Sequence, residues 1–171
     1  MARAWSYMVN TRQEECEMSD LDVRIVDMAP MRVASAHGFG TNPEEQAWNK
    51  ILAFAEARGI DIGTARFFGF NNPNPSPGSP NYGYEQWMTV SADVQASGEI
   101  TIKEIPARRY AVTHCEGVST ITEVWRKFIL WFEDSPYRKP AHCCECLEEL
   151  LTPPDVPFEE YVFDLYLPIA G

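Results

Sequence analysis

The sequence predicts an α+β fold built from two similar halves, each with the element order ββαββ, one long helix and an antiparallel sheet. Two observations predict it. Strand-like stretches flank a helical pattern twice along the chain. Sliding the chain by 77 residues without a gap also gives ten identical pairs over positions 23–91, where roughly four are expected from ordinary composition. A duplicated half explains this excess better than chance does, and a central ligand cleft is expected on the pseudo-two-fold axis.

The first half begins with two strands, 23–28 and 31–37, joined tightly at Ala29-Pro30. A helix follows, with Pro43 in its first turn, Trp48, Ile51 and Leu52 at helical spacing, and Gly59 at its end. A strand at 66–71, a Pro-rich loop at 73–80 and an aromatic strand at 84–90 complete this half.

The second half repeats this plan. Strands are expected at 99–105 and 109–115, a helix at 120–133, and strands at 144–151 and 161–167 on either side of a second Pro loop. We therefore expect a lead-in at 1–20 and one domain at 21–171, divided into halves at about 21–95 and 96–169.

Composition limits the class of protein. The chain has 171 residues, enough for one core, and a formal charge of −11, which disfavours direct binding to nucleic acid or anionic membranes and favours a cationic ligand. No signal peptide or membrane-spanning stretch is recognisable, so a cytoplasmic location is expected. Five cysteines, an odd number, are expected to be free thiols in a reducing compartment.

The segment His142-Cys143-Cys144-Glu145-Cys146 contains a CxxC pair. A closed zinc site usually needs a second ligand pair, and only His114-Cys115 is available. In a continuous strand Cys143 and Cys146 would also point to opposite faces. No metal site and no cofactor is therefore predicted.

Several segments together resemble the gyrase-inhibitor-like (GyrI-like) small-molecule-binding domains, which are related to the effector-binding domains of AraC-type and MerR-type drug-sensing regulators. They are the entry at 23–40, the strand Tyr-Gly-Tyr-Glu-Gln-Trp at 82–87, the strand at 109–114 before Glu116-Gly117, the helix with Trp125 and the closing strand at 163–169. The resemblance covers about 21–169. It implies the tandem ββαββ fold and an aromatic cleft with a carboxylate for bulky, often cationic or planar molecules. The first twenty residues are too few for a DNA-reading domain, so the chain resembles the stand-alone members.

Strand alternation assigns candidate binding residues. In 84–90, Tyr84 and Met88 take the core side, whereas Glu85 and Trp87 point the other way, as Tyr166 does in the last strand. A large indole beside a carboxylate suggests a pocket in which Trp87 stacks on the ligand and Glu85 pairs with its charge or moves a proton. A solvated acid beside a partly buried indole is the alternative.

A second carboxylate comes from the strand at 144–151. Glu148 resembles the family's pocket carboxylate by position, with Glu145 in reserve because a bulge would exchange the faces, and Glu149 lies beside Glu145 in face. Burial near aromatic rings would raise the pKa of this carboxyl, which suits a cation partner or a general base.

Residues shared by both halves are interpreted as scaffold, as for His37/His114 and Trp48/Trp125, because function has no reason to appear twice. Residues that break the repeat are expected to carry function. The resulting ligand-binding set is Glu85, Trp87, Tyr110, Glu148 and Tyr166, with Glu145 and Tyr84 in reserve.

Three functions follow from these expectations. The first is a stand-alone effector- or toxin-binding protein for a bulky apolar, cationic or planar compound. The second, implied by the resemblance, is a hydrolase of cyclopropane-bearing toxins with Glu148 or Glu85 as catalytic base, so whether the protein is an enzyme is left open. The third is an interaction with DNA gyrase or with a regulator.

Overall fold

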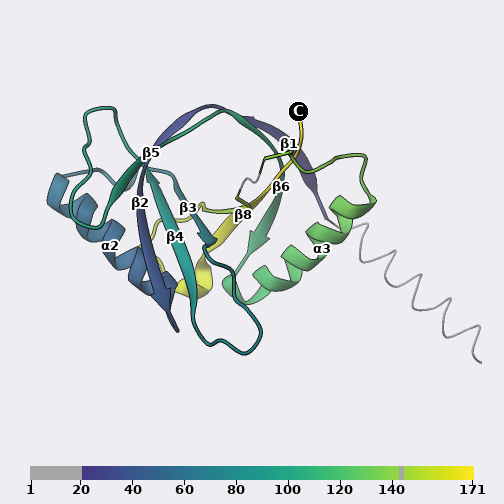
Figure 1. Cartoon of the computed structure of the whole chain (residues 1–171), viewed down its shortest axis with the longest axis horizontal. Helices are drawn as coiled ribbons and strands as arrows, with labels where there is room; N and C mark the ends of the chain where they lie inside the picture. Colours follow the sequence, from purple (N-terminus) through teal and green to yellow (C-terminus); the bar gives the residue numbers. More distant parts are fainter. Residues whose placement is uncertain (1–20, 143–144) are drawn as a thin grey trace, which may run out of the picture.

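The computed structural model describes residues 21–142 and 145–171 (Figure 1). The predicted α+β class is confirmed, and the strands and helices follow one another in the predicted order. The strands are β1 (Val23–Met28), β2 (Met31–Gly40), β3 (Phe67–Asn71), β4 (Tyr82–Thr89), β5 (Thr101–Ile105), β6 (Arg108–Glu116), β7 (Leu147–Leu150) and β8 (Val162–Pro168). The helices are α2 (Pro43–Arg58) and α3 (Ile121–Asp134), with short 3₁₀ turns at Val118–Thr120 and Phe158–Glu160.

The strands form one curled antiparallel sheet rather than two separate sheets, in the order β1-β6-β8-β7-β3-β4-β2-β5. The two halves join where β3 pairs with β7. If β1 to β4 are matched in order with β5 to β8, each strand and its counterpart lie at equal distances from opposite edges of the sheet. The sheet order is therefore symmetric about the β3–β7 pair. That the halves descend from a duplication stays a prediction.

The first two strands are adjacent in sequence but do not pair with each other. β1 pairs with β6 and β2 pairs with β5, so the two strands joined at Ala29-Pro30 do not form a hairpin. In Figure 1 the chain leaves β1 on the right and crosses the top of the molecule to β2 on the left. Pro30 lacks the backbone N–H that a hairpin ladder would use, and the chain continues extended through this point.

The strand pairings correct the expected register of the repeat. Ala34 pairs with Met88 and Ala111 pairs with Leu167, so a 77-residue shift in β2 becomes a 79-residue shift in β4. The longer shift makes Gly69 the counterpart of Glu148, where the ungapped comparison gave Asn71. The second half is therefore two residues longer than the first between these paired positions.

Both faces of the sheet are buried. The helices cover one face: α2 packs on Ala34, Ala36 and Met88, whereas α3 packs on Ala111 and Leu165. The opposite face carries a second apolar cluster that includes Val33, Phe68, Trp87, Tyr110, Val112, Leu147 and Tyr166. In the described part of the chain, neither helix is long and apolar enough to cross a membrane.

Local sequence explains where α2 begins and ends. Pro43 occupies its first turn with Glu44 and Glu45, where negative charge favours the helix N-terminus. Gly59 ends it in the left-handed conformation, with φ of 63°, which only glycine adopts at little cost. The opposite end of α2, its first turn with Glu44 and Glu45, lines the cavity described next.

Candidate functional site

A cavity of about 710 Å³ lies between α2 and α3 on the helix-covered face of the sheet. Seven of its 17 lining residues are aromatic, and both halves contribute similar residues: Trp48 and Tyr82 from the first, Trp125 and Tyr161 from the second. The lining is completed by Asn42, Glu44, Glu45, Asn71, Tyr84, Gln86, Val118, Ile121, Thr122, Glu148, Leu150, Phe158 and Phe163. A volume of this size is typical of small-molecule pockets.

Glu148 stands at the junction of the two halves, where β7 pairs with β3. Its Oε1 accepts a hydrogen bond of 2.8 Å from Trp125 Nε1, and its Oε2 accepts one of 3.3 Å from the Tyr84 hydroxyl. Desolvation raises the pKa of this carboxyl; these two hydrogen bonds oppose the rise, and the charge of Glu44 adds to it. The carboxylate therefore holds a proton more readily than an exposed glutamate.

Gly69 makes room for this arrangement. It pairs directly with Glu148 across the β3–β7 ladder. A Cβ atom at residue 69 would lie 1.9 Å from the Tyr84 hydroxyl oxygen. Only glycine at this position lets Tyr84 reach the carboxylate. The paired positions 69 and 148 therefore differ: residue 148 carries a carboxylate, and residue 69 carries no side chain.

The cavity is acidic. Three of its lining residues, Glu44, Glu45 and Glu148, carry carboxylates, and none of the lining residues is a lysine, arginine or histidine. Glu44 accepts hydrogen bonds of 2.7 and 2.9 Å from the Tyr82 hydroxyl. Desolvation and this acceptor raise the pKa of Tyr82 to about 12. The Tyr82 hydroxyl is therefore a neutral hydrogen-bond donor at neutral pH.

The predicted site residues do not all come together. Glu148 and the reserve residue Tyr84 line the cavity. Glu85, Trp87, Tyr110 and Tyr166 instead lie in the opposite face of the sheet, because they alternate with the cavity-facing residues of their strands. Glu85 and Glu148 therefore do not face a common cleft.

Glu85 is the acceptor in a buried polar cluster. Its carboxylate receives hydrogen bonds from Trp87 Nε1 (2.6 Å), Ser35 Oγ (2.7 Å) and Asn72 Nδ2 (3.1 Å), and it forms an ion pair with Lys103. Desolvation acts to raise the pKa of Glu85, but these donors outweigh it and hold the pKa below its ordinary value. Such a carboxylate is a poor general base. The indole of Trp87 is explained by this second core rather than by an open pocket.

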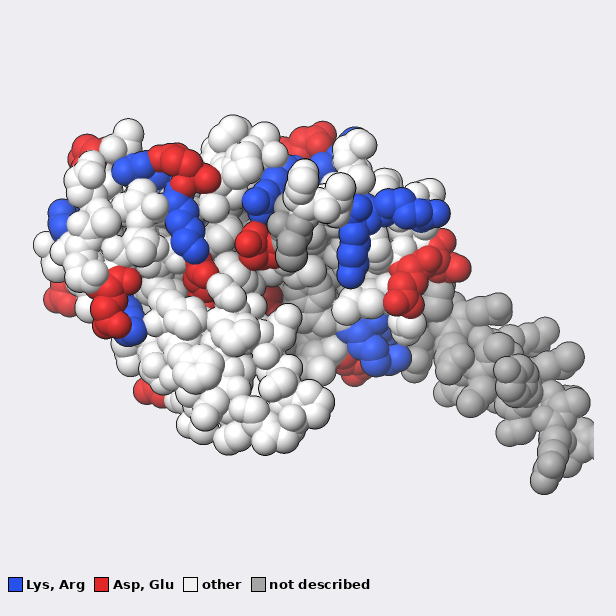
Figure 2. Space-filling view, in the orientation of Figure 1, with Lys and Arg blue, Asp and Glu red and all other residues white. Residues whose placement is uncertain are grey.

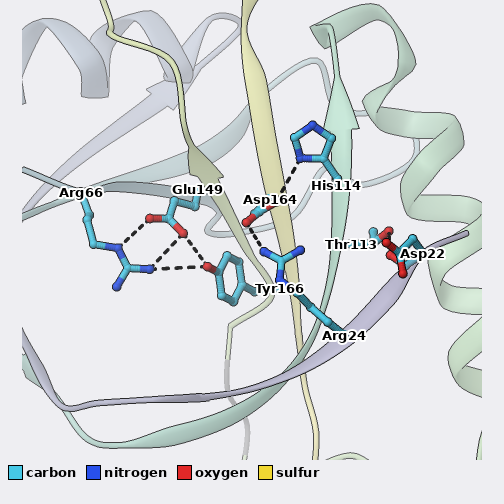
Figure 3. A network of polar contacts seen from close by, with 8 residues as sticks. All are labelled: Asp22, Arg24, Arg66, Thr113, His114, Glu149, Asp164 and Tyr166. Carbon is cyan, nitrogen blue, oxygen red and sulfur yellow. Dashed lines mark hydrogen bonds and ion pairs between the residues drawn. The ribbon is translucent and has the colours of Figure 1, made fainter.

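Tyr166 and Glu149 form a related cluster on the same face (Figure 3). Arg66 holds Glu149 through two hydrogen bonds, Nε to Oε1 at 2.7 Å and Nη2 to Oε2 at 3.0 Å, and the Tyr166 hydroxyl donates to the same carboxylate. Tyr110 packs edge-on against Tyr166 with 5.5 Å between ring centres and is fully buried. Figure 3 also shows Asp164 held by Arg24 and His114.

Glu145, the other reserve residue, forms an ion pair of 2.9 Å with Arg108 and does not line the cavity. Cys143 and Cys144 lie outside the described residues, so the CxxC interpretation is untested. Among residues 21–142 and 145–171, no three metal-ligating side chains gather in one place.

Sequence reasoning missed several residues of the cavity. Trp48 and Trp125 were interpreted as scaffold because they occur in both halves, yet a cavity on a pseudo-two-fold axis takes its walls from both halves. Glu44, Tyr82 and Gln86 gave no separate signal, although Tyr82 and Gln86 alternate with Glu85 along the strand. Tyr82, Tyr84 and Gln86 are each two residues apart, so strand alternation could have placed all three on one face.

Surface charge is mixed. On the face shown in Figure 2, the Lys and Arg side chains of the described residues lie among Asp and Glu. The lower part of this face is uncharged, where the loop between β3 and β4 projects. The picture shows no continuous basic surface in the described part of this face.

Structural comparison finds the same fold in solved proteins. The EcmrR chain in a cryo-EM EcmrR–DNA complex aligns with a TM-score of 0.69 at 15% identity, over 98% of this chain and 63% of the EcmrR chain. This chain thus spans less than two thirds of that protein. A hydrolase from Listeria innocua aligns at 0.65 and 11% identity over 93% and 98% of the two chains, and SAV2435 bound to tetraphenylphosphonium aligns at 0.52 and 13% identity over 88% and 94%. No functionally curated protein matches the sequence.

Sequence-family comparison agrees with the fold found by structural comparison. The model of the GyrI-like small molecule binding domain matches residues 21–170, which is most of the chain. The chain belongs to the GyrI-like small-molecule-binding domain family.

Proposed function

We propose that this protein binds a bulky, apolar organic cation in the cavity between α2 and α3, with Glu148 as the partner of the positive charge. The observation that carries the proposal is the charge of the lining: three carboxylates, no basic side chain, and aromatic rings on both walls. Aromatic faces attract cations, and a desolvated carboxylate pairs with them strongly. No ion pair among the described residues involves Glu44, Glu45 or Glu148, so their charge is available to a ligand.

Tetraphenylphosphonium is the first probe, because SAV2435, which shares the fold, was solved with it. Binding should quench tryptophan fluorescence through Trp48 and Trp125 in the cavity walls, and it should raise the melting temperature. Glu148→Gln should weaken binding about tenfold or more, whereas the matched Glu145→Gln, which removes the same charge outside the cavity, should leave it unchanged. Equal loss in both variants, or no binding by the wild type, would contradict the proposal.

A hydrolase is the second candidate, because Glu148 combines a raised pKa with an aromatic cavity. In this scheme Glu148 takes a proton from water, the water oxygen bonds to a strained ring carbon, the ring C–C bond to that carbon breaks, and Glu148 returns the proton to the carbon or conjugated oxygen that receives the electron pair. Incubation with a cyclopropane-bearing alkylating compound should then release a ring-opened product, and Glu148→Gln should abolish its release. Binding without product would favour the first function. Glu85 is a weaker choice for this base because its carboxylate is held by four donors, and contact with DNA gyrase stays a prediction.

A further inference from the structure

One polar atom of a cavity-lining residue has no hydrogen-bond partner in the described part of the chain. Gln86 lines the cavity and is only 1% exposed. Its Nε2 donates to the backbone oxygens of Phe68 at 3.0 Å and Trp87 at 3.3 Å. Its Oε1 is buried and has no hydrogen-bond donor among the described residues. A buried acceptor left in this state is costly unless something supplies a donor.

The orientation of this amide is fixed. Because Nε2 is bonded to two backbone carbonyl oxygens, exchanging nitrogen and oxygen would place three acceptors together. Gln86 points to the helix side of the sheet, as Tyr84 and Met88 do. With Nε2 bonded to the strand backbone, Oε1 occupies the other edge of the planar amide of this cavity-lining residue.

We infer that the cavity selects cations that carry N–H groups, such as amidinium or aryl iminium ions, over fully alkylated cations. This inference rests on the proposed function. An N–H donor would satisfy Gln86 Oε1, and carboxylates at Glu148 and at Glu44 offer further acceptors along the same cavity. A fully alkylated onium ion could meet the negative charge but would leave Oε1 unsatisfied. A site built to receive a hydrogen bond discriminates strongly against a ligand that lacks the donor.

A matched pair of fluorescent xanthene cations tests this. Rhodamine 123 carries primary amino groups, whereas tetramethylrhodamine methyl ester has the same charge and ring system with no N–H. Fluorescence anisotropy should show rhodamine 123 binding to the wild-type protein about tenfold more tightly or better. Equal affinities for the two dyes would overturn this inference but would not contradict the proposed function. If neither dye nor tetraphenylphosphonium bound, the proposed function itself would be contradicted.

Variants separate hydrogen bonding from the size of the methyl groups. Gln86→Met keeps a side chain of similar length and removes the acceptor, so the preference for rhodamine 123 should fall to about one. Gln86→Leu serves the same purpose if the methionine variant does not fold. A preference that survives these substitutions would mean that methyl groups are excluded by shape, which contradicts the inference. Glu148→Gln should weaken both dyes by a similar factor and keep the preference.

Discussion

Trp125 on α3 donates a hydrogen bond of 2.8 Å to Glu148 on β7, and this bond ties a helix to the strand at the centre of the sheet. The bond favours the ionised carboxylate, whereas desolvation favours the protonated one and prevails. The balance between them governs both the stability of the domain and its expected affinity for cations.

Removing the charge of Glu148 should stabilise the empty protein. Because the folded-state pKa is raised, Glu148 lowers stability as pH rises through that pKa, and this loss is absent below the unfolded value. Glu148→Gln should therefore melt higher than the wild type at pH 8, by about 2–4 °C for each kcal/mol gained, and should lose this advantage near pH 4. Thermal denaturation at both pH values measures it. The same gain in Glu145→Gln would point to net charge rather than to Glu148.

Binding of a cation should follow the ionisation of Glu148. Affinity is expected to rise with pH through the raised pKa, and Trp125→Phe should move the midpoint to higher pH because a donor to the ionised form is lost. Below the midpoint the variant should bind about tenfold more weakly. A titration of dye anisotropy against pH reports this shift, and the plateau at high pH reports any lost stacking separately. An unchanged midpoint would show that another group controls binding.

Glu85→Gln should behave in the opposite way to Glu148→Gln. The pKa of Glu85 is lowered despite desolvation, so its contribution to stability is present above the unfolded pKa and is lost as pH falls through the folded value. The variant should be destabilised by about 1–3 kcal/mol at pH 7, a moderate loss since Lys103 is partly exposed, and the difference should shrink in acid. Urea unfolding at pH 7 and pH 4 measures it. An altered ligand affinity in a folded variant would show that Glu85 contributes to ligand binding.

Gly69→Ala should be costly because of Tyr84. The new methyl group would meet the tyrosine hydroxyl at 1.9 Å and would force the ring away from Glu148. A loss of about 1–3 kcal/mol is expected from such overpacking. In a Tyr84→Ala background the same substitution should cost much less, which a double-mutant cycle measures as a coupling energy. Additive effects would mean that the glycine is needed for another reason.

Much of the fold could be predicted from the sequence because periodicity and turn residues are local signals. Pro43 and Gly59 mark α2 within the chain itself. Strand partners are not local: the pairing of β1 with β6 depends on contacts between residues about 85 apart, which no pattern within either strand records. For this reason the tight joining expected at Ala29-Pro30 did not identify the partners of the two strands.

The site was harder to predict, because alternation separates two faces without saying which one borders a cavity. Trp87 and Glu85 were assigned to the correct side of β4, opposite Tyr84 and Met88, but that side is a second core. Glu148 lines the cavity, yet its partner Trp125 was set aside as scaffold because of its counterpart Trp48. Symmetry of the walls, with asymmetry at Gly69 and Glu148, could be recognised only once strand pairing fixed the register.

The pairing of β1 with β6 and of β2 with β5 means that each half lends its first strand to the edge of the other. Neither half can therefore complete its own sheet. In a fragment ending near residue 95, β1 would have no β6 to pair with, and β2 would have no β5. Such a fragment is expected to pair these strands with a second copy of itself. During synthesis β1 has no partner until β6 has emerged, and pairing between strands so far apart in sequence is slow. The ligand cavity takes its lining from both halves, so it too forms only when the two halves have come together.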